Sequence, residues 1–258
     1  PILPRMLRRG LWALLLPVLV AACSVQSATS QEFVLGLVAP LTGDSGLTAR
    51  EDSRGAQVAV DEVNRRGGVQ GHLVRLVTQA ADTREATGPA VLALKAAGAT
   101  VVMGSYSSQP SMPTAAATSA AGLVYWEAGA VADQITGAAL ARVFRVGAAG
   151  SNLGRGSAVF ATDELAPRLH RAVSQLRLTV VEEHDAYGDS VADAVAAEAT
   201  ARGAQVSPMI RYDAYRPDWN TVFAAVAANH PDVLVLASYI PDGVAFRREM
   251  LERGVRVG

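Results

Sequence analysis

Residues 33–43 read FVLGLVAPLTG, an apolar run that ends in a proline and glycine turn. An apolar run of this length predicts a strand that is buried on both faces, because a half-exposed strand would alternate polar and apolar residues. The segment 52–66 that follows carries alanine and valine at helical spacing and stops at Gly67-Gly68. Glycine is favoured just after a helix ends. The two segments together therefore predict one βα unit.

The same alternation continues to the end of the chain. It predicts further strands at 73–80, 100–105, 122–127, 142–146, 177–184, 205–212 and 232–238, and helices at 85–97, 109–121, near 133, within 157–174, and at 190–202, 217–229 and 242–253. Buried strands that alternate with helices indicate an α/β fold with parallel sheets. About 225 residues exceed one comfortable core, so we expect two lobes. The boundary is expected in the glycine-rich stretch 147–156, with lobe 1 at 33–146 and lobe 2 at 147–258.

The N-terminal segment has the order of a secretory signal. Arginines come first, the apolar run 11–20 follows, and the small residues Ala21 and Ala22 precede Cys23. From Leu11 to Cys23 there are 13 residues, whereas a membrane-spanning helix needs about 20. Residues 1–22 are therefore predicted to be a removed signal peptide.

Cys23 is the only cysteine of the chain. The sequence VAAC at 20–23 resembles the lipobox of bacterial lipoproteins, which implies that Cys23 is lipidated and that residues 23–32 form a polar tether to a membrane. The alternative is a small buried apolar residue, but the polar tract that follows Cys23 does not suit a core. A single cysteine also excludes a disulfide within the chain.

Composition excludes several classes of function. Without residues 1–22 the chain has 20 basic and 24 acidic residues, so no nucleic-acid partner is expected. The single lysine, Lys95, follows Leu94, which rules out a phosphate-binding P-loop, and the GxSxG and GxGxxG motifs are absent. The four histidines are far apart in the sequence. We therefore expect no metal, no cofactor and no enzyme, and we expect the paired acids Glu182-Glu183 to lie on solvated faces.

The carboxyl ends of the predicted strands are unusually polar and aromatic. They carry SYSS at 105–108, EAGA at 127–130, DAYG at 185–188 and SY at 238–239. Ligands of open α/β sheets bind outside the carboxyl ends of the strands, and a helix start with two hydroxyl groups suits a carboxylate. Each feature also has a plainer interpretation, such as a serine N-cap or a glycine turn. Their coincidence at four junctions favours a ligand cleft between two lobes.

Several motifs in this order resemble the type I periplasmic binding proteins of the leucine/isoleucine/valine-binding group. They are APLTG, GAQVAVDEVNRRGGVQG, VVMGSYSSQPSMPTA, FRVG, HDAYGDS and HPDVLVLASYIPDG, which run from Phe33 to the end of the chain. The resemblance implies two Rossmann-like lobes that close over a ligand in a Venus-flytrap mechanism and present a closed surface to an ABC permease. It implies that the ligand carboxylate is held by Ser107 or Ser108, that backbone contacts come from Gly129 and Ala130, and that aromatic contacts come from Tyr187 and Tyr239.

The chain departs from the family pattern at the pocket and at its end. Val131 stands where relatives have a threonine, Thr48 stands where they have an aromatic residue, and Glu127 lies next to the expected backbone contacts, either facing the pocket or facing solvent. The sequence also ends at LERGVRVG, as a new strand begins. We therefore expect an incomplete second lobe, and the acid that pairs with a ligand ammonium in relatives is expected beyond it.

The combined interpretation is a lipid-anchored receptor in the periplasm or on the outer face of the cytoplasmic membrane. It would bind an amino acid or a related small polar ligand for an ABC importer. One alternative is a sensor module of the same fold, and another is a receptor for short amides or urea. An exported α/β enzyme is a third, based only on His184 and Asp185 beside Tyr187.

Overall fold

The computed structural model describes residues 32–43 and 45–257, which form two parallel β-sheets. The first sheet has the strand order β2-β1-β3-β4-β5. Its strands are β1 (Phe33–Ala39), β2 (Val74–Ala80), β3 (Val101–Gly104), β4 (Val124–Glu127) and β5 (Val143–Arg145). The second sheet is built around β6 (Arg177–Glu183) with β7 (Gln205–Val206), β8 (Ile210–Tyr212) and β9 (Val233–Ala237). The prediction of an α/β fold with parallel sheets is confirmed.

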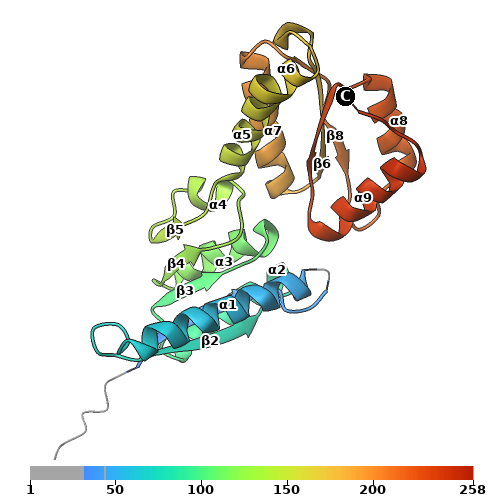
Figure 1. Cartoon of the computed structure of the whole chain (residues 1–258). Coiled ribbons are helices and arrows are strands. Elements are labelled where there is room, and N and C mark those ends of the chain that lie inside the picture. Colours follow the sequence, from blue (N-terminus) through green and yellow to red (C-terminus); the bar gives the residue numbers. More distant parts are fainter. Residues whose placement is uncertain (1–31, 44, 258) are drawn as a thin grey trace, which may run out of the picture.

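Helices connect the strands and cover the sheets, so that the described residues form two lobes (Figure 1). Lobe 1 contains α1 (Gly46–Arg65), α2 (Arg84–Ala96), α3 (Ser108–Ala120) and the short α4 (Gln134–Gly137). Lobe 2 contains α5 (Gly150–Phe160), the π-helical turn η1 (Ala161–Leu165), α6 (Ala166–Arg168), the 3₁₀ turn η2 (Val173–Gln175), α7 (Ala186–Ala201), α8 (Trp219–Asn229) and α9 (Ile240–Glu252). The loop that contains residue 147 separates the two sheets.

The opening strand β1 lies at the centre of lobe 1, between β2 and β3. Val38 is fully buried, as the apolar run predicts, and packs in the same core as Leu94 and Val102. Gly36 allows α2 to lie close to the strand, since a Cβ atom there would come within 2.9 Å of Leu94 Cδ1. Burial of each such aliphatic side chain contributes about 1.5–3 kcal/mol.

Strand β6 has the same central position in lobe 2, where its two faces pack into different cores. Leu178 and Val180 pack beneath α7 in one core, and Val181 packs with Tyr212 and Phe246 in the other. Both faces are thus covered, which is the condition under which a parallel sheet is stable.

The glycine-rich stretch differs from its expected form. We predicted a loop there and a helix within 157–174, whereas α5 begins at Gly150 and continues through Gly154. The reason is helix packing, because a Cβ atom at Gly154 would lie 2.2 Å from the carbonyl oxygen of Val191 in α7, and one at Gly150 would lie 2.6 Å from Ser190 Cβ. These glycines allow α5 and α7 to approach closely.

A second difference concerns the expected strand 205–212, which is divided into β7 and β8. Both pair with β6, at Arg177–Leu178 and at Val181–Glu183 respectively. Pro208 lies between them and has no N–H to donate, which interrupts the ladder.

Among the described residues, no helix combines the length and apolarity that crossing a membrane requires. The predicted signal peptide, Cys23 and most of the predicted tether lie outside those residues.

Candidate ligand-binding cleft

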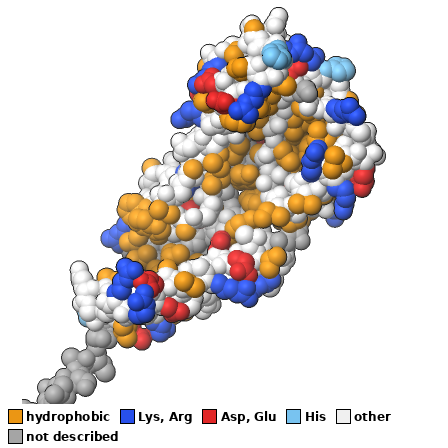
Figure 2. Space-filling view, viewed as in Figure 1, with side chains coloured by type: hydrophobic (Ala, Val, Ile, Leu, Met, Phe, Trp, Pro, Cys, Tyr) orange, Lys and Arg blue, Asp and Glu red, His pale blue; other side chains and the backbone are white. Residues whose placement is uncertain are grey.

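A cavity of about 630 Å³ lies between the two lobes, at the carboxyl ends of strands from both sheets. Lobe 1 contributes the loop after β1, including Pro40, and the loop from β3 into α3, including Ser107. Lobe 2 contributes Glu183 at the end of β6 and Tyr239 just after β9. Figure 2 shows the hollow between the lobes, with hydrophobic side chains along its walls. This is the position expected for a ligand of an open α/β sheet.

The lobe 1 wall includes the N-terminus of α3, where Ser107 is the N-cap residue. The Ser107 side chain makes no capping hydrogen bond, so its hydroxyl group is not committed to the helix end. The first backbone N–H groups of a helix have no partner within the helix and favour a negative group. This wall is therefore suited to a carboxylate or another acceptor.

Beside this wall, Glu127 is fully buried and organises the loop after β4. Its carboxylate accepts five hydrogen bonds, from the backbone amides of Ser105 (3.1 Å), Gly129 (2.8 Å) and Ala130 (2.8 Å) and from the hydroxyls of Tyr125 (2.7 Å) and Ser111. Burial raises the pKa of Glu127 to about 6, although these hydrogen bonds oppose the shift. Glu127 thus acts as a structural anchor and does not line the cavity.

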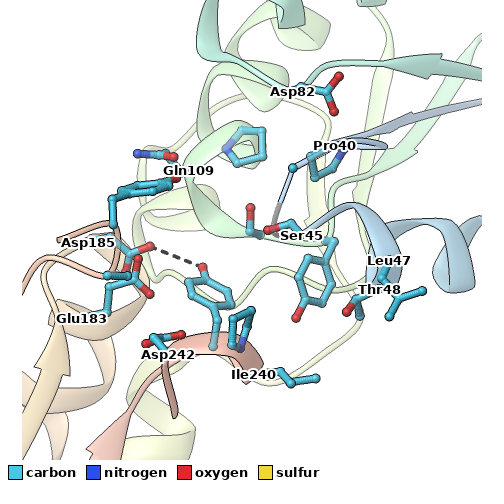
Figure 3. Close-up of a pocket in the computed structure, with 18 of the residues that line it drawn as sticks. Pro40, Ser45, Leu47, Thr48, Asp82, Gln109, Glu183, Asp185, Ile240 and Asp242 are labelled. Carbon is cyan, nitrogen blue, oxygen red and sulfur yellow. Dashed lines mark hydrogen bonds between the residues drawn. The ribbon is translucent and has the colours of Figure 1, made fainter. Parts of the chain in front are cut away.

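The lobe 2 wall is acidic. Glu183, Asp185 and Asp242 all line the cavity, and Figure 3 shows the three carboxylates grouped on one side of it. Burial raises the pKa of Glu183 to about 8, with a further contribution from the neighbouring carboxylates of Asp185, Asp242 and Asp213. A concentration of negative charge in a partly buried site disfavours its own ionisation.

Tyrosines hold this acidic wall in place and reach across to lobe 1. The Tyr239 hydroxyl donates to Asp185 Oδ2 at 3.3 Å, and its ring lies 5.0 Å from the ring of Tyr187 and 6.2 Å from that of Tyr106. The Tyr212 hydroxyl donates to Asp242. Because Tyr106 belongs to lobe 1, the Tyr106–Tyr239 contact joins the two walls of the cleft.

Comparison with known proteins identifies the family of this chain. The family model described as periplasmic binding protein matches residues 32–258. The chain belongs to the periplasmic binding protein family. This family consists of binding proteins, which agrees with the expectation that the chain is not an enzyme.

Individual relatives of this periplasmic binding protein come from the group that the sequence resembles. A Leu/Ile/Val-binding protein homologue of Brucella abortus is 30% identical over 234 residues, which cover 90% of this chain and 58% of the relative. Another homologue, from Brucella melitensis, is 29% identical over 251 residues, which cover 97% of this chain and 62% of the relative. The chain thus spans about three fifths of the length of these relatives.

Solved structures agree on the fold. A leucine-binding protein of Thermotoga maritima superposes with a TM-score of 0.76 at 18% identity, over 87% of this chain and 61% of the other. A substrate-binding protein of an ABC transporter from Desulfitobacterium hafniense, solved with leucine, gives a TM-score of 0.69 at 24% identity, over 88% and 65%. The predicted type I periplasmic binding protein fold is confirmed.

The predicted site residues of this binding protein occupy different positions around the cleft. Ser107 and Tyr239 line the cavity. Ser108 is buried, and its hydroxyl oxygen accepts a hydrogen bond from Ala132 N at 3.1 Å. Tyr187 does not line the cavity. Its ring packs against the ring of Tyr239, and its hydroxyl donates to the Ser238 carbonyl oxygen at 3.3 Å.

The backbone N–H groups of Gly129 and Ala130 are both engaged by Glu127 in this structure. Thr48 lines the cavity, at the position where the resemblance implied an aromatic residue, whereas Val131 does not line it. The roles of all the predicted site residues toward a ligand stay predictions.

The expectation that Glu182 and Glu183 are solvated was wrong. Glu182 is fully buried and pairs with Arg211 at 2.8 Å, whereas Glu183 lines the cavity. The sequence analysis also missed Asp242 and Trp219 as lining residues. Glu183 could have been found from its place at the carboxyl end of a strand. Asp242 belongs to the motif HPDVLVLASYIPDG, which was read without a role for this acid, and Trp219 lies in the first turn of α8, outside the motifs that were quoted.

Proposed function

We propose that this chain is the extracytoplasmic solute receptor of an ABC importer and that it binds an amino acid or a related small polar ligand between its lobes. The observation that carries the proposal is the cavity of about 630 Å³ lined by strand ends of both sheets. Small-molecule sites have volumes of about 300–1,000 Å³. Membership of the periplasmic binding protein family supports the same role.

The two walls offer complementary chemistry for such a ligand. The start of α3 with Ser107 suits an acceptor group, and the carboxylates of Glu183 and Asp242 suit a donor group. A zwitterionic ligand that contacts both walls would favour the closed arrangement of the lobes, since a ligand shifts a conformational equilibrium by its difference in affinity for the two states.

The first test is a thermal-shift titration of the protein expressed from its complete gene. The panel contains leucine, valine, arginine, lysine, small amides, urea and small carboxylates. A ligand at 100 times its dissociation constant stabilises the folded state by about 2.7 kcal/mol. A saturable shift with any member supports the receptor function, and small-angle scattering should then show a more compact particle. Absence of a shift with every member would contradict it.

We also propose that Cys23 attaches the receptor to the outer face of a membrane through a lipid, for which the sequence VAAC is the support. Mass spectrometry of the protein purified from membranes should find acyl chains on Cys23. The Cys23→Ala variant should leave the membrane fraction, and an unmodified cysteine in the native protein would contradict the proposal.

A further inference from the structure

The charged residues around the cavity all have the same sign. Among the described lining residues, the charged side chains are Asp82, Glu183, Asp185 and Asp242, with no lysine, arginine or histidine. A neutral zwitterion brings one positive group and one negative group, and the start of α3 already suits the negative one. Burial raises the pKa of Glu183 to about 8, so this carboxyl is largely neutral in the empty cavity at pH 7.5, and a bound cation would favour its ionised form. The other three acids of the lining still outnumber the single cationic group that a neutral amino acid brings.

The three acids of lobe 2 lack the basic partners that other buried acids of the lobe have. Asp232 pairs with Arg171 and Arg177, and Glu182 pairs with Arg211. By contrast, Asp185 and Asp242 accept hydrogen bonds from tyrosine hydroxyls and a backbone amide. A buried carboxylate without a cation is costly unless a ligand supplies one.

Glu183 shows this lack of a partner most clearly. Its Oε2 atom is buried and has no hydrogen-bond partner among the described residues, although the side chain lines the cavity. In Figure 3 this carboxylate lies on the same side of the cavity as Asp185 and Asp242. A donor bound in the cavity would satisfy this oxygen after a small rotation of the carboxylate, because Oε2 is closed to solvent in its present position.

Aromatic rings border the same space. Tyr106, Tyr215, Trp219 and Tyr239 line the cavity from both lobes. An ammonium or guanidinium group over an aromatic face gains about 0.5–2 kcal/mol, according to its exposure. Rings together with carboxylates recognise organic cations, and no group of three or more His, Cys, Asp or Glu in the described part of the chain is arranged to hold a metal ion.

Taking the receptor function as given, we propose that the ligand carries a net positive charge, with an ammonium or guanidinium group placed against Glu183, Asp185 and Asp242. The ligand class is thus a basic amino acid, a diamine or a guanidine compound. A branched aliphatic amino acid would leave the carboxylates at the far end of its side chain without a partner.

The test is calorimetric titration of the complete gene product with arginine, lysine, 1,4-diaminobutane, leucine and propionamide at pH 7.5. We expect at least one of the three cations to bind about tenfold or more tightly than leucine and propionamide, because each 1.4 kcal/mol of charge pairing changes affinity tenfold. The affinity for the cation should also fall with added salt.

Two variants locate the cationic group. Glu183→Gln keeps the shape of the side chain and should weaken cation binding about tenfold or more, and Asp242→Asn should do the same. Glu164→Gln, an exposed acid of lobe 2 paired with Arg168, is the matched control and should leave affinity unchanged. Circular dichroism and thermal unfolding establish that each variant is folded.

The outcomes separate the ligand class from the receptor function. Binding of leucine or propionamide as tightly as any cation would overturn the cationic ligand and leave the receptor function intact. Cation binding that is unchanged in a folded Glu183→Gln protein would also overturn it. No binding by any of the five compounds would overturn the cationic ligand, and the wider thermal-shift panel would then decide the receptor function.

Discussion

The carboxylate of Glu127 should be one of the larger single contributors to the stability of lobe 1. Replacing Glu127 by Ala removes the acceptor of five hydrogen bonds, three of them from backbone amides at the edge of the cleft. A buried donor left without a partner costs about 1–3 kcal/mol. Water entry and a small shift of the loop would satisfy some donors, so we expect a loss of about 3–5 kcal/mol.

Glu127→Gln should lower the stability by less than Glu127→Ala does. If the amide nitrogen replaces Oε2, the hydroxyls of Ser111 and Tyr125 can turn and accept from it, which leaves the Ser105 amide as the unsatisfied donor. The loss should then be about 1–3 kcal/mol. The glutamine should therefore be intermediate between wild type and alanine.

The pH dependence of Glu127 provides a separate check. Its folded-state pKa of about 6 lies above the ordinary 4.5, so its contribution to stability is largest below pH 4.5 and is lost as the pH rises through 6. Such a shift corresponds to about 2 kcal/mol. The Glu127→Gln variant should lack this part of the pH profile.

Urea unfolding measures the stability losses of Glu127→Ala and Glu127→Gln and the pH dependence of stability. Each appears as a shift of the unfolding midpoint while the dependence on urea concentration keeps the same slope. Glu51→Ala is the control, since Glu51 is an exposed acid paired with Arg54 and its removal should cost less than about 1 kcal/mol. A Glu127→Ala protein within about 1 kcal/mol of wild type would show that the five hydrogen bonds do not hold the loop.

Three further predictions concern other parts of the molecule. The folded-state pKa of Glu183, about 8, lies above the ordinary 4.5, so the contribution of Glu183 to stability should fall as the pH rises from 4.5 to 8. The fall should be roughly 2 kcal/mol after solvent screening. The free energy of unfolding should therefore differ less between pH 5 and pH 8.5 in Glu183→Gln than in the wild type. Gly154→Ala should lower the thermal midpoint by several degrees because its Cβ meets α7, whereas Gly156→Ala, with no atom within 4 Å, should raise it slightly through helix propensity. Ser107→Ala should weaken ligand binding with little effect on stability, whereas Ser108→Ala should cost about 1 kcal/mol of stability. Ligand titration and unfolding of both variants measure the two effects. The opposite pattern would reverse the assignment of the two serines.

The sequence by itself determined the alternation of strands and helices and the parallel pairing of the strands. Apolar runs such as 33–39 and 233–237 are too uniformly hydrophobic to face water, and the helices between the strands require parallel pairing. The same local patterns located Ser107 and Tyr239 at strand ends, because a parallel sheet brings the carboxyl ends of its strands to one edge. These features depend on residues that are close in sequence, and the structure has them where the patterns predict.

The tertiary structure decided which side chains meet. Residues 183 and 242 are far apart in the chain, and only the pairing of β6 with β9 brings Glu183 and Asp242 to one wall of the cavity. Gly154 lies within a helix because α7 packs against it, although glycine alone favours a loop. Glu127 is buried because five donors from three segments converge on it, and no local pattern encodes that convergence. Burial, charge and hydrogen bonding of a side chain depend on neighbours from distant segments, so local sequence located the edge of the cleft, and folding determined its chemistry.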